Sequence, residues 1–250
     1  MRCRGRRLGA VGILALSAHS LLIAQNKGGA KSSQNTISIP TVGCKADGQA
    51  GPVDAPDVPK TKTVNADPAS VQKLAYYTSG GVGVLGPRGW FCFEVYGSNG
   101  GTLLVGPQTL DLSSDTDFTG PGIAFSYWDG QSSGRFEVAE VIARVFPAHK
   151  AFATGVSEGF GTTFSFGPFP KDKLTYKGGN VVEFQTPLQT DGLGTYQSFK
   201  KNDTRIDGVA ILVGPTPNLR FLSVRLPTDL AALTRVIVQQ AERDSKALDY

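Results

Sequence analysis

Histidine and cysteine are scarce in this 250-residue sequence, which holds two of the first and three of the second. A structural zinc site needs about four cysteine, histidine or carboxylate ligands, and a cysteine nucleophile needs a neighbouring base. His19 falls in an N-terminal segment that we interpret as a removable signal, which leaves His149 for either role. The sequence therefore predicts no metal site and no cofactor, and it disfavours a catalytic cysteine.

Acidic residues are absent from the first 24 residues, which carry four arginines ahead of an apolar run over residues 8–24. A basic start followed by such a run is typical of a secretory signal peptide. Ser17, His19 and Ser20 interrupt the run, which is short for a membrane-spanning helix. We therefore interpret residues 1–24 as a signal peptide cleaved near Ala24, and we expect a periplasmic or secreted protein without a transmembrane segment.

The chain that remains after cleavage has no excess of charge. The full sequence has 25 basic and 21 acidic residues, and the four arginines of the signal account for the difference. No long basic run replaces them, since Lys200 and Lys201 form only a pair. Composition therefore gives no support to a nucleic-acid partner, and we expect a protein or a cell-envelope component instead.

Cleavage also removes Cys3 and leaves Cys44 and Cys92. Two cysteines in an exported protein most simply form one disulfide bond. Two free thiols, or a bond between two molecules, are the alternatives that the sequence leaves open.

Hydrophobic patterning predicts an α+β fold with a mainly antiparallel sheet and about three helices. The polar segment 25–36 is expected to be a flexible tail. Residues 37–130 are interpreted as a disulfide-bearing β-rich module, and residues 131–250 as a helix–antiparallel sheet–helix module. A boundary near residues 129–134 and one continuous domain are both compatible with the pattern.

Helices are expected at three places. Asp67 and Pro68 are good starting residues for the first, which the apolar spacing extends to Thr78. The second covers residues 135–146, and the third runs from Thr228 to about Arg243. Asn99-Gly100 is expected to be a hairpin turn, because both residues tolerate positive φ. The expected strands cover residues 37–42, 90–96, 102–105, 123–128, 151–154, 162–166, 181–185, 206–213 and 219–226.

Two motifs match catalytic patterns and fail on their context. Residues 81–86 read GVGVLG, but a dinucleotide-binding loop needs a strand before it and a helix after it, and here the predicted order is reversed. Residues 155–159 read GVSEG, the pattern of a serine nucleophile elbow. The sequence after Ser157 is not helical, and the one available base, His149, precedes it. We interpret residues 155–159 as a turn between strands and keep Ser157 with His149 as a weak hydrolase candidate.

Carboxylates offer a route to glycoside hydrolysis that needs no histidine. Glu94 lies on one strand face with Trp90 and Cys92, and Arg88 is its nearest expected partner. Sugar rings stack on aromatic side chains, so Trp90 and Trp128 are binding candidates, with Tyr127 beside them. Arg88 is a further binding candidate, because it could line the same cleft as Glu94 and Trp128. Asp111, Asp115 and Asp117 also cluster, but they lack the calcium-loop pattern and are interpreted as a solvated loop. The other carboxylates near aromatic or glycine-rich segments are Asp129, Glu137 and Glu158.

Two blocks carry a resemblance to other sequences. Residues 85–93 (LGPRGWFCF) with residues 96–98 (YGS), and residues 43–49 (GCKADGQ), are similar to blocks in a group of uncharacterised exported bacterial proteins. The likeness covers about residues 42–106. It implies no activity, but it favours a bond between Cys44 and Cys92, because the two blocks occur together.

Taken together, these patterns predict an exported, disulfide-stabilised protein that acts by binding or as a structural component. A secreted hydrolase that uses carboxylates or Ser157 is the alternative.

Overall fold

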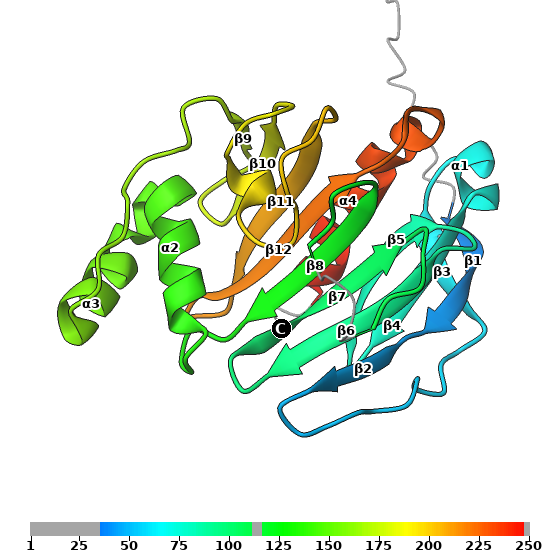
Figure 1. The fold of residues 1–250 in the computed structure, drawn as a ribbon, viewed down its shortest axis with the longest axis horizontal. Helices are drawn as coiled ribbons and strands as arrows, with labels where there is room; N and C mark the ends of the chain where they lie inside the picture. Colours follow the sequence, from blue (N-terminus) through cyan, green and yellow to red (C-terminus); the bar gives the residue numbers. More distant parts are fainter. Residues whose placement is uncertain (1–35, 112–116, 248–250) are drawn as a thin grey trace, which may run out of the picture. The chain divides into compact units, whose positions relative to one another are not determined.

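A computed structural model describes residues 36–111 and 117–247 and has the predicted α+β fold, with mainly antiparallel strands (Figure 1). Four α-helices occur in this part of the chain. Three of them have 11 residues or more, which agrees with the expected number of about three. The expected signal peptide, almost all of the expected tail and Asp115 lie outside the described residues.

The strands form a small sheet and a large one. The small sheet has the order β3-β1-β4-β5, in which β1 pairs antiparallel with β3 and parallel with β4. Its strands are β1 (Thr36–Gly43), β3 (Thr61–Asn65), β4 (Leu74–Ser79) and β5 (Val82–Pro87).

The large sheet has eight strands in the order β2-β6-β7-β8-β12-β11-β10-β9, and only β2 and β6 pair in parallel. Since β8 pairs with both β7 and β12, strands from both sides of residues 129–134 belong to one sheet. Its strands are β2 (Lys45–Gly48), β6 (Phe91–Gly97), β7 (Gly100–Gly106), β8 (Gly122–Trp128), β9 (Lys173–Tyr176), β10 (Val181–Thr186), β11 (Ile206–Val213) and β12 (Asn218–Arg225).

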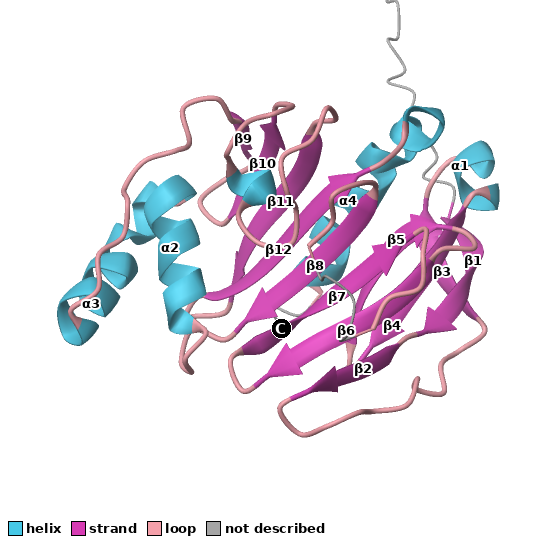
Figure 2. Cartoon of the chain, viewed as in Figure 1, coloured by secondary structure: helices cyan, strands magenta, loops and turns pink. Residues whose placement is uncertain are grey.

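The two faces of the large sheet have different covers (Figure 2). On one face Phe125 and Leu222 pack in a core with Tyr77 of the small sheet and Ile237 of helix α4 (Thr234–Lys246). On the other face, aromatic side chains of β10 and β12 pack in a second core with helix α2 (Arg135–Val145). Successive side chains along β8 point to opposite faces of the sheet. Two adjacent residues of this strand therefore pack in different cores and cannot belong to the same site.

The disulfide bond between Cys44 and Cys92 is confirmed, with Cα atoms 5.4 Å apart and a sequence separation of 48. Cys44 follows β1 of the small sheet, whereas Cys92 is on β6 of the large sheet. The bond therefore joins the two sheets at the point where the chain passes from one to the other.

The first helix is much shorter than expected. Helix α1 (Pro68–Gln72) begins as predicted, because Asp67 Oδ1 accepts hydrogen bonds from the backbone N–H groups of Ala69 and Ser70 at 3.0 Å each. The extension to Thr78 is wrong, because Leu74–Ser79 is β4, buried between β1 and β5. Aromatic and β-branched residues suit a strand there, and pairing on both sides outweighs an apolar spacing that fits a helix.

A helix also replaces the turn and strand predicted around Ser157. Helix α3 (Lys150–Phe160) follows the short 3-10 helix η1 (Pro147–His149) and packs on α2. Its two glycines lower helix propensity, so the sequence carries no helical signal there. The helix ends at Gly161, whose φ of 64° suits glycine. The strand expected over residues 162–166 is also wrong, since these residues form a loop.

The third helix begins later than expected. Residues Thr228–Leu233 form the 3-10 helix η3, in which Pro227 rather than Thr228 occupies the position before the first turn. The α-helical part, α4, then follows with Ile237 and Ala241 buried as the apolar spacing predicts. A further 3-10 turn, η2 (Leu193–Thr195), lies in the long polar segment before β11.

The β6–β7 hairpin is confirmed, but its turn is displaced by one residue. Gly97 pairs with Gly100, so Ser98 and Asn99 form the turn. Gly100 has φ 140°, and a side chain there would collide with the carbonyl oxygen of Tyr127 on β8. Glycine at this position lets the hairpin end lie close against β8.

Candidate functional site

A cavity of about 360 Å³ lies at the end of the β6–β7 hairpin, on the face of the large sheet that carries α2. We call it the hairpin pocket. The hairpin forms one side, α2 and the end of β8 form a second, and the loop before β11 forms the third. Its lining residues are Val95, Tyr96, Gly97, Asn99, Gly100, Gly101, Thr102, Leu104, Asp117, Trp128, Glu137, Gln197 and Ser198.

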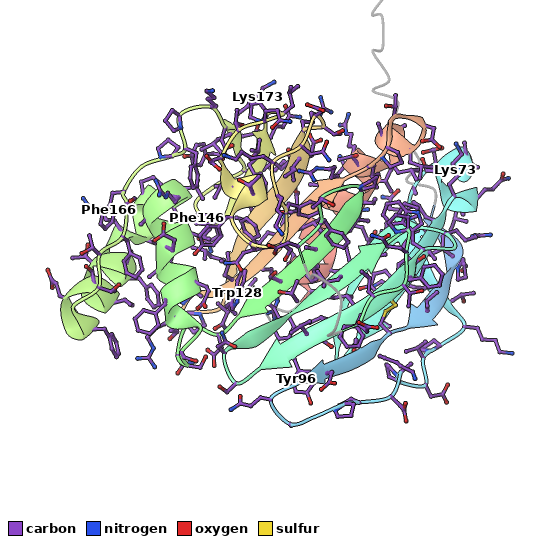
Figure 3. All side chains as sticks on the ribbon, in the orientation of Figure 1. Lys73, Tyr96, Trp128, Phe146, Phe166 and Lys173 are labelled. Carbon is purple, nitrogen blue, oxygen red and sulfur yellow. A yellow bond between two sulfur atoms is a disulfide. The ribbon has the colours of Figure 1, made fainter. Side chains whose placement is uncertain are left out.

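Trp128 occupies the end of β8 beside α2, and Tyr96 lies at the neighbouring end of β6 (Figure 3). The Trp128 side chain is 5% exposed, and its ring packs at 6.3 Å from that of Phe221. On the same face the hydroxyl groups of Thr102 and Ser126 are 2.8 Å apart. The pocket therefore combines part of an indole ring, packed on Phe221, with the hydroxyl group of Thr102.

Glu137 enters the pocket from the first turn of α2. Its Oε2 atom is buried and accepts no hydrogen bond from the described residues. Glu140, one turn later, instead pairs with Arg144 at 3.3 Å. An unpaired buried carboxylate oxygen costs free energy, so Glu137 holds an unsatisfied acceptor at the pocket wall, which a bound donor would satisfy once the side chain turns toward the cavity.

Tyr196 adds a hydroxyl group close to these acids. Burial raises its pKa, and the negative charges of Glu140 and Glu137 raise it further. The phenol therefore stays protonated at neutral pH and remains a donor.

Backbone hydrogen bonds between Phe118 and residues 198–200 hold the loop that forms the third side of the pocket. The N–H of Phe118 donates to the carbonyl oxygen of Ser198 at 2.7 Å, and the N–H of Lys200 donates back to Phe118 at 3.0 Å. Lys200 Nζ also lies 3.7 Å from Asp117 Oδ2. These contacts hold Asp117 and Ser198 at the pocket although they are distant from the hairpin in sequence.

Glu94 lies on the opposite face of the large sheet. It is 2% exposed, and Tyr127 Oη donates a hydrogen bond of 2.8 Å to its Oε1 atom. The Tyr127 ring reaches Glu94 across Gly101, where any side chain would collide with it. The prediction that Arg88 is the partner of Glu94 is wrong. The Arg88 guanidinium instead donates to the carbonyl oxygens of Val71 and Leu74.

The Glu94 cluster has the properties of a structural group. Burial raises the pKa of Tyr127, and the hydrogen bond to Glu94 raises it further. Arg220 lies over the same ring, 5.4 Å from its centroid, and burial lowers its pKa. Tyr127 thus lies between a buried acid and a half-buried base and stabilises both.

We expect Tyr127→Phe to lower the free energy of unfolding by about 2 kcal/mol, because Glu94 Oε1 would stay buried without its donor. Urea denaturation at neutral pH measures this change. Tyr176→Phe removes a hydroxyl group from an exposed tyrosine of β9 and should leave stability unchanged. Equal stability of the two variants would show that the Glu94 hydrogen bond contributes nothing.

Ser157 and His149 have separate partners. Ser157 Oγ donates to the carbonyl oxygen of Thr162 at 2.5 Å, within the C-terminal turn of α3. His149 Nε2 lies 2.7 Å from the side-chain oxygen of Asn180. In this arrangement His149 does not accept the proton of Ser157, as a base would.

Two of the binding candidates lie at the other end of β6 from the pocket. Arg88 is bonded to backbone as described above. The backbone N–H of Trp90 donates to the hydroxyl group of Tyr77 at 3.1 Å. The indole side chain of Trp90 packs against the core between the sheets. Burial raises the pKa of Tyr77 to about 12, so this hydroxyl group also remains protonated.

The structure thus brings together Trp128 and Glu137, which the sequence had named, with Asp117, which the sequence had placed in a solvated loop. Gln197 and Ser198 were missed, because a polar segment of loop carries no periodicity that would assign it to a site. No protein-family model, curated protein or solved structure matches this chain. No helix within residues 36–111 and 117–247 has the length and hydrophobicity to cross a membrane.

Proposed function

We propose that this protein is exported and binds a small, hydroxyl-rich ligand of the saccharide class in the hairpin pocket. Export is supported by the basic and apolar N-terminal sequence and by the disulfide bond, which persists in oxidising compartments. The observation that carries the binding proposal is the unpaired Glu137 Oε2 atom in the wall of a pocket that Trp128 also lines.

The pocket offers the complementary groups that a sugar needs. Hydroxyl groups of a sugar donate to carboxylates and both donate to and accept from amides and hydroxyls. Glu137, Gln197 and Asn99 supply these groups, while Trp128 offers apolar surface to ring C–H groups. A volume of about 360 Å³ lies within the range of small-ligand sites.

Glycoside hydrolysis is the second candidate, and one observation favours it. Asp117 and Glu137 line the same pocket, and hydrolysis of a glycosidic bond requires two carboxylates that flank it.

The hairpin includes part of the blocks that resemble exported bacterial proteins, and we propose that those proteins have the same pocket rim.

We expect Glu137→Gln to weaken saccharide binding at least tenfold, since a hydrogen bond to a charged acceptor contributes about 1.5–3 kcal/mol. An immobilised glycan panel would select the ligand, and calorimetric titration would measure its dissociation constant. Glu158→Gln, a change of the same type at an exposed position of α3, should bind as the wild type does.

Three outcomes separate the candidates. Saturable binding without cleavage, lost in Glu137→Gln, supports a binding protein. Release of reducing sugar that is lost in the Glu137→Gln and Asp117→Asn variants supports the hydrolase. Binding that is unaffected by Glu137→Gln and Trp128→Phe would contradict the assignment of the pocket.

A further inference from the structure

A second cavity, of about 490 Å³, lies between α4 and the last strands of the large sheet. We call it the α4 groove, and it is formed by β9, β10 and the start of β11 on one side and by η3 and α4 on the other. Helix α4 contacts β11 and β12, and the sheet continues past it by two more strands. The groove arises where β9 and β10 extend beyond the helix.

The carboxylates of the α4 groove are already paired. Asp207 accepts from Arg205 Nε at 3.0 Å and from Gln185 Nε2 at 2.8 Å. Glu183 accepts from Lys177, which also donates to Glu242 at 2.7 Å. Each acid that lines this groove therefore has a cationic partner, although Lys177 also serves Glu242. The lining holds four cations, Lys173, Lys177, Arg205 and Arg235, against the two acids Glu183 and Asp207.

The donors of the α4 groove show the opposite pattern. Lys173 on β9 and Arg235 on α4 make no ion pair with any described residue, and both are exposed. Figure 3 labels Lys173 at the edge of the large sheet. Thr175, Thr234 and Gln239 also line the groove and make no side-chain hydrogen bond within residues 36–111 and 117–247.

We propose that the α4 groove is a binding site for an oxyanion group, a carboxylate, sulfate or phosphate, held between Lys173 and Arg235. Several unpaired donors around one cavity suit a ligand with several acceptor oxygens. Hydrogen bonds to an ionised acceptor are about twice as strong as neutral ones. This site does not depend on the hairpin pocket, since the two lie on opposite faces of the large sheet.

The test is a titration of the full protein with sodium phosphate, sodium sulfate and sodium citrate at fixed ionic strength, followed by the NMR signals of the Gln185 and Gln239 side-chain amides. We expect saturable shifts with at least one anion, and the preferred anion identifies the oxyanion class. The Lys173→Gln/Arg235→Gln variant should bind that anion about tenfold more weakly, because it loses two charge-assisted contacts.

The control is Lys171→Gln/Lys246→Gln, which removes the same charge at two exposed positions that do not line the groove. It should bind like the wild type. An equal loss in both variants would show a general effect of net charge and would overturn the proposal. The absence of saturable shifts with all three anions would also overturn it.

Discussion

Replacing Cys44 and Cys92 together with alanine will lower the free energy of unfolding by about 4 kcal/mol. In the chain-entropy model, a bond that closes a loop of 48 residues restricts the unfolded chain by this amount. Cys44 is also buried in the core between the two sheets, so the substitution leaves apolar surface less well packed. The bond therefore stabilises the attachment of the small sheet as well as the whole fold.

Guanidinium denaturation of the wild type and the double variant measures this effect. Reduction of the wild type should reproduce the loss, and the double variant should show no response to reductant. A difference below about 1 kcal/mol would mean that β-pairing and the shared core hold the two sheets together without help from the bond.

Replacing Arg225 with methionine will lower the free energy of unfolding by about 3 kcal/mol, because buried carbonyl oxygens lose a charged hydrogen-bond donor. Arg225 is 2% exposed and stacks on the ring of Phe199. Its Nη2 atom donates to the carbonyl oxygen of Lys200 at 2.6 Å, and Nη1 lies 3.3–3.4 Å from three carbonyl oxygens of residues 118–120. Methionine keeps the apolar contact but removes the donor of the Lys200 and Gly120 carbonyl oxygens, whereas Phe118 and Thr119 keep their bonds to Lys200 and Asn202.

Arg220→Met is the matched control, because Arg220 lies on the same strand and its guanidinium donates no hydrogen bond to a described residue, whereas that of Arg225 donates to several carbonyl oxygens. Removing a half-buried cation that makes no hydrogen bond should change stability by less than about 1 kcal/mol. Equal losses in the two variants would contradict the role assigned to the Arg225 network.

The Arg225 network also has a consequence for the hairpin pocket. It anchors the two segments that carry Asp117 and Ser198. Arg225→Met should therefore weaken ligand binding as well as stability, although Arg225 does not line the pocket.

Elements with one consistent signal were predictable from the sequence. Helix α2 has an apolar face and an ion pair of Glu140 with Arg144, and β11 and β12 are rich in β-branched and other apolar residues and are joined by a turn. Elements with conflicting signals were not. The residues of β4 have helical apolar spacing but are paired on both sides, and α3 contains glycines that only its packing on α2 overcomes.

The candidate site was predictable only in part. Trp128 and Glu137 were named because aromatic and acidic side chains are common in binding sites, but nothing in the sequence placed them together. Their proximity depends on β8 ending where α2 begins, and the third side depends on Arg225 holding a distant loop. Glu94 was also named from the sequence, as an acid among aromatic residues, but it lies outside the pocket. It is buried and accepts a hydrogen bond from Tyr127 across Gly101.

The central claim is that the hairpin pocket binds a hydroxyl-rich ligand, and NMR mapping of the selected saccharide on the labelled protein tests it most directly. The account predicts shifts concentrated at Asn99, Gly101, Thr102 and Gln197 and at the indole N–H of Trp128, with all of them lost in Glu137→Gln. Shifts concentrated elsewhere, such as along the α4 groove, would contradict it.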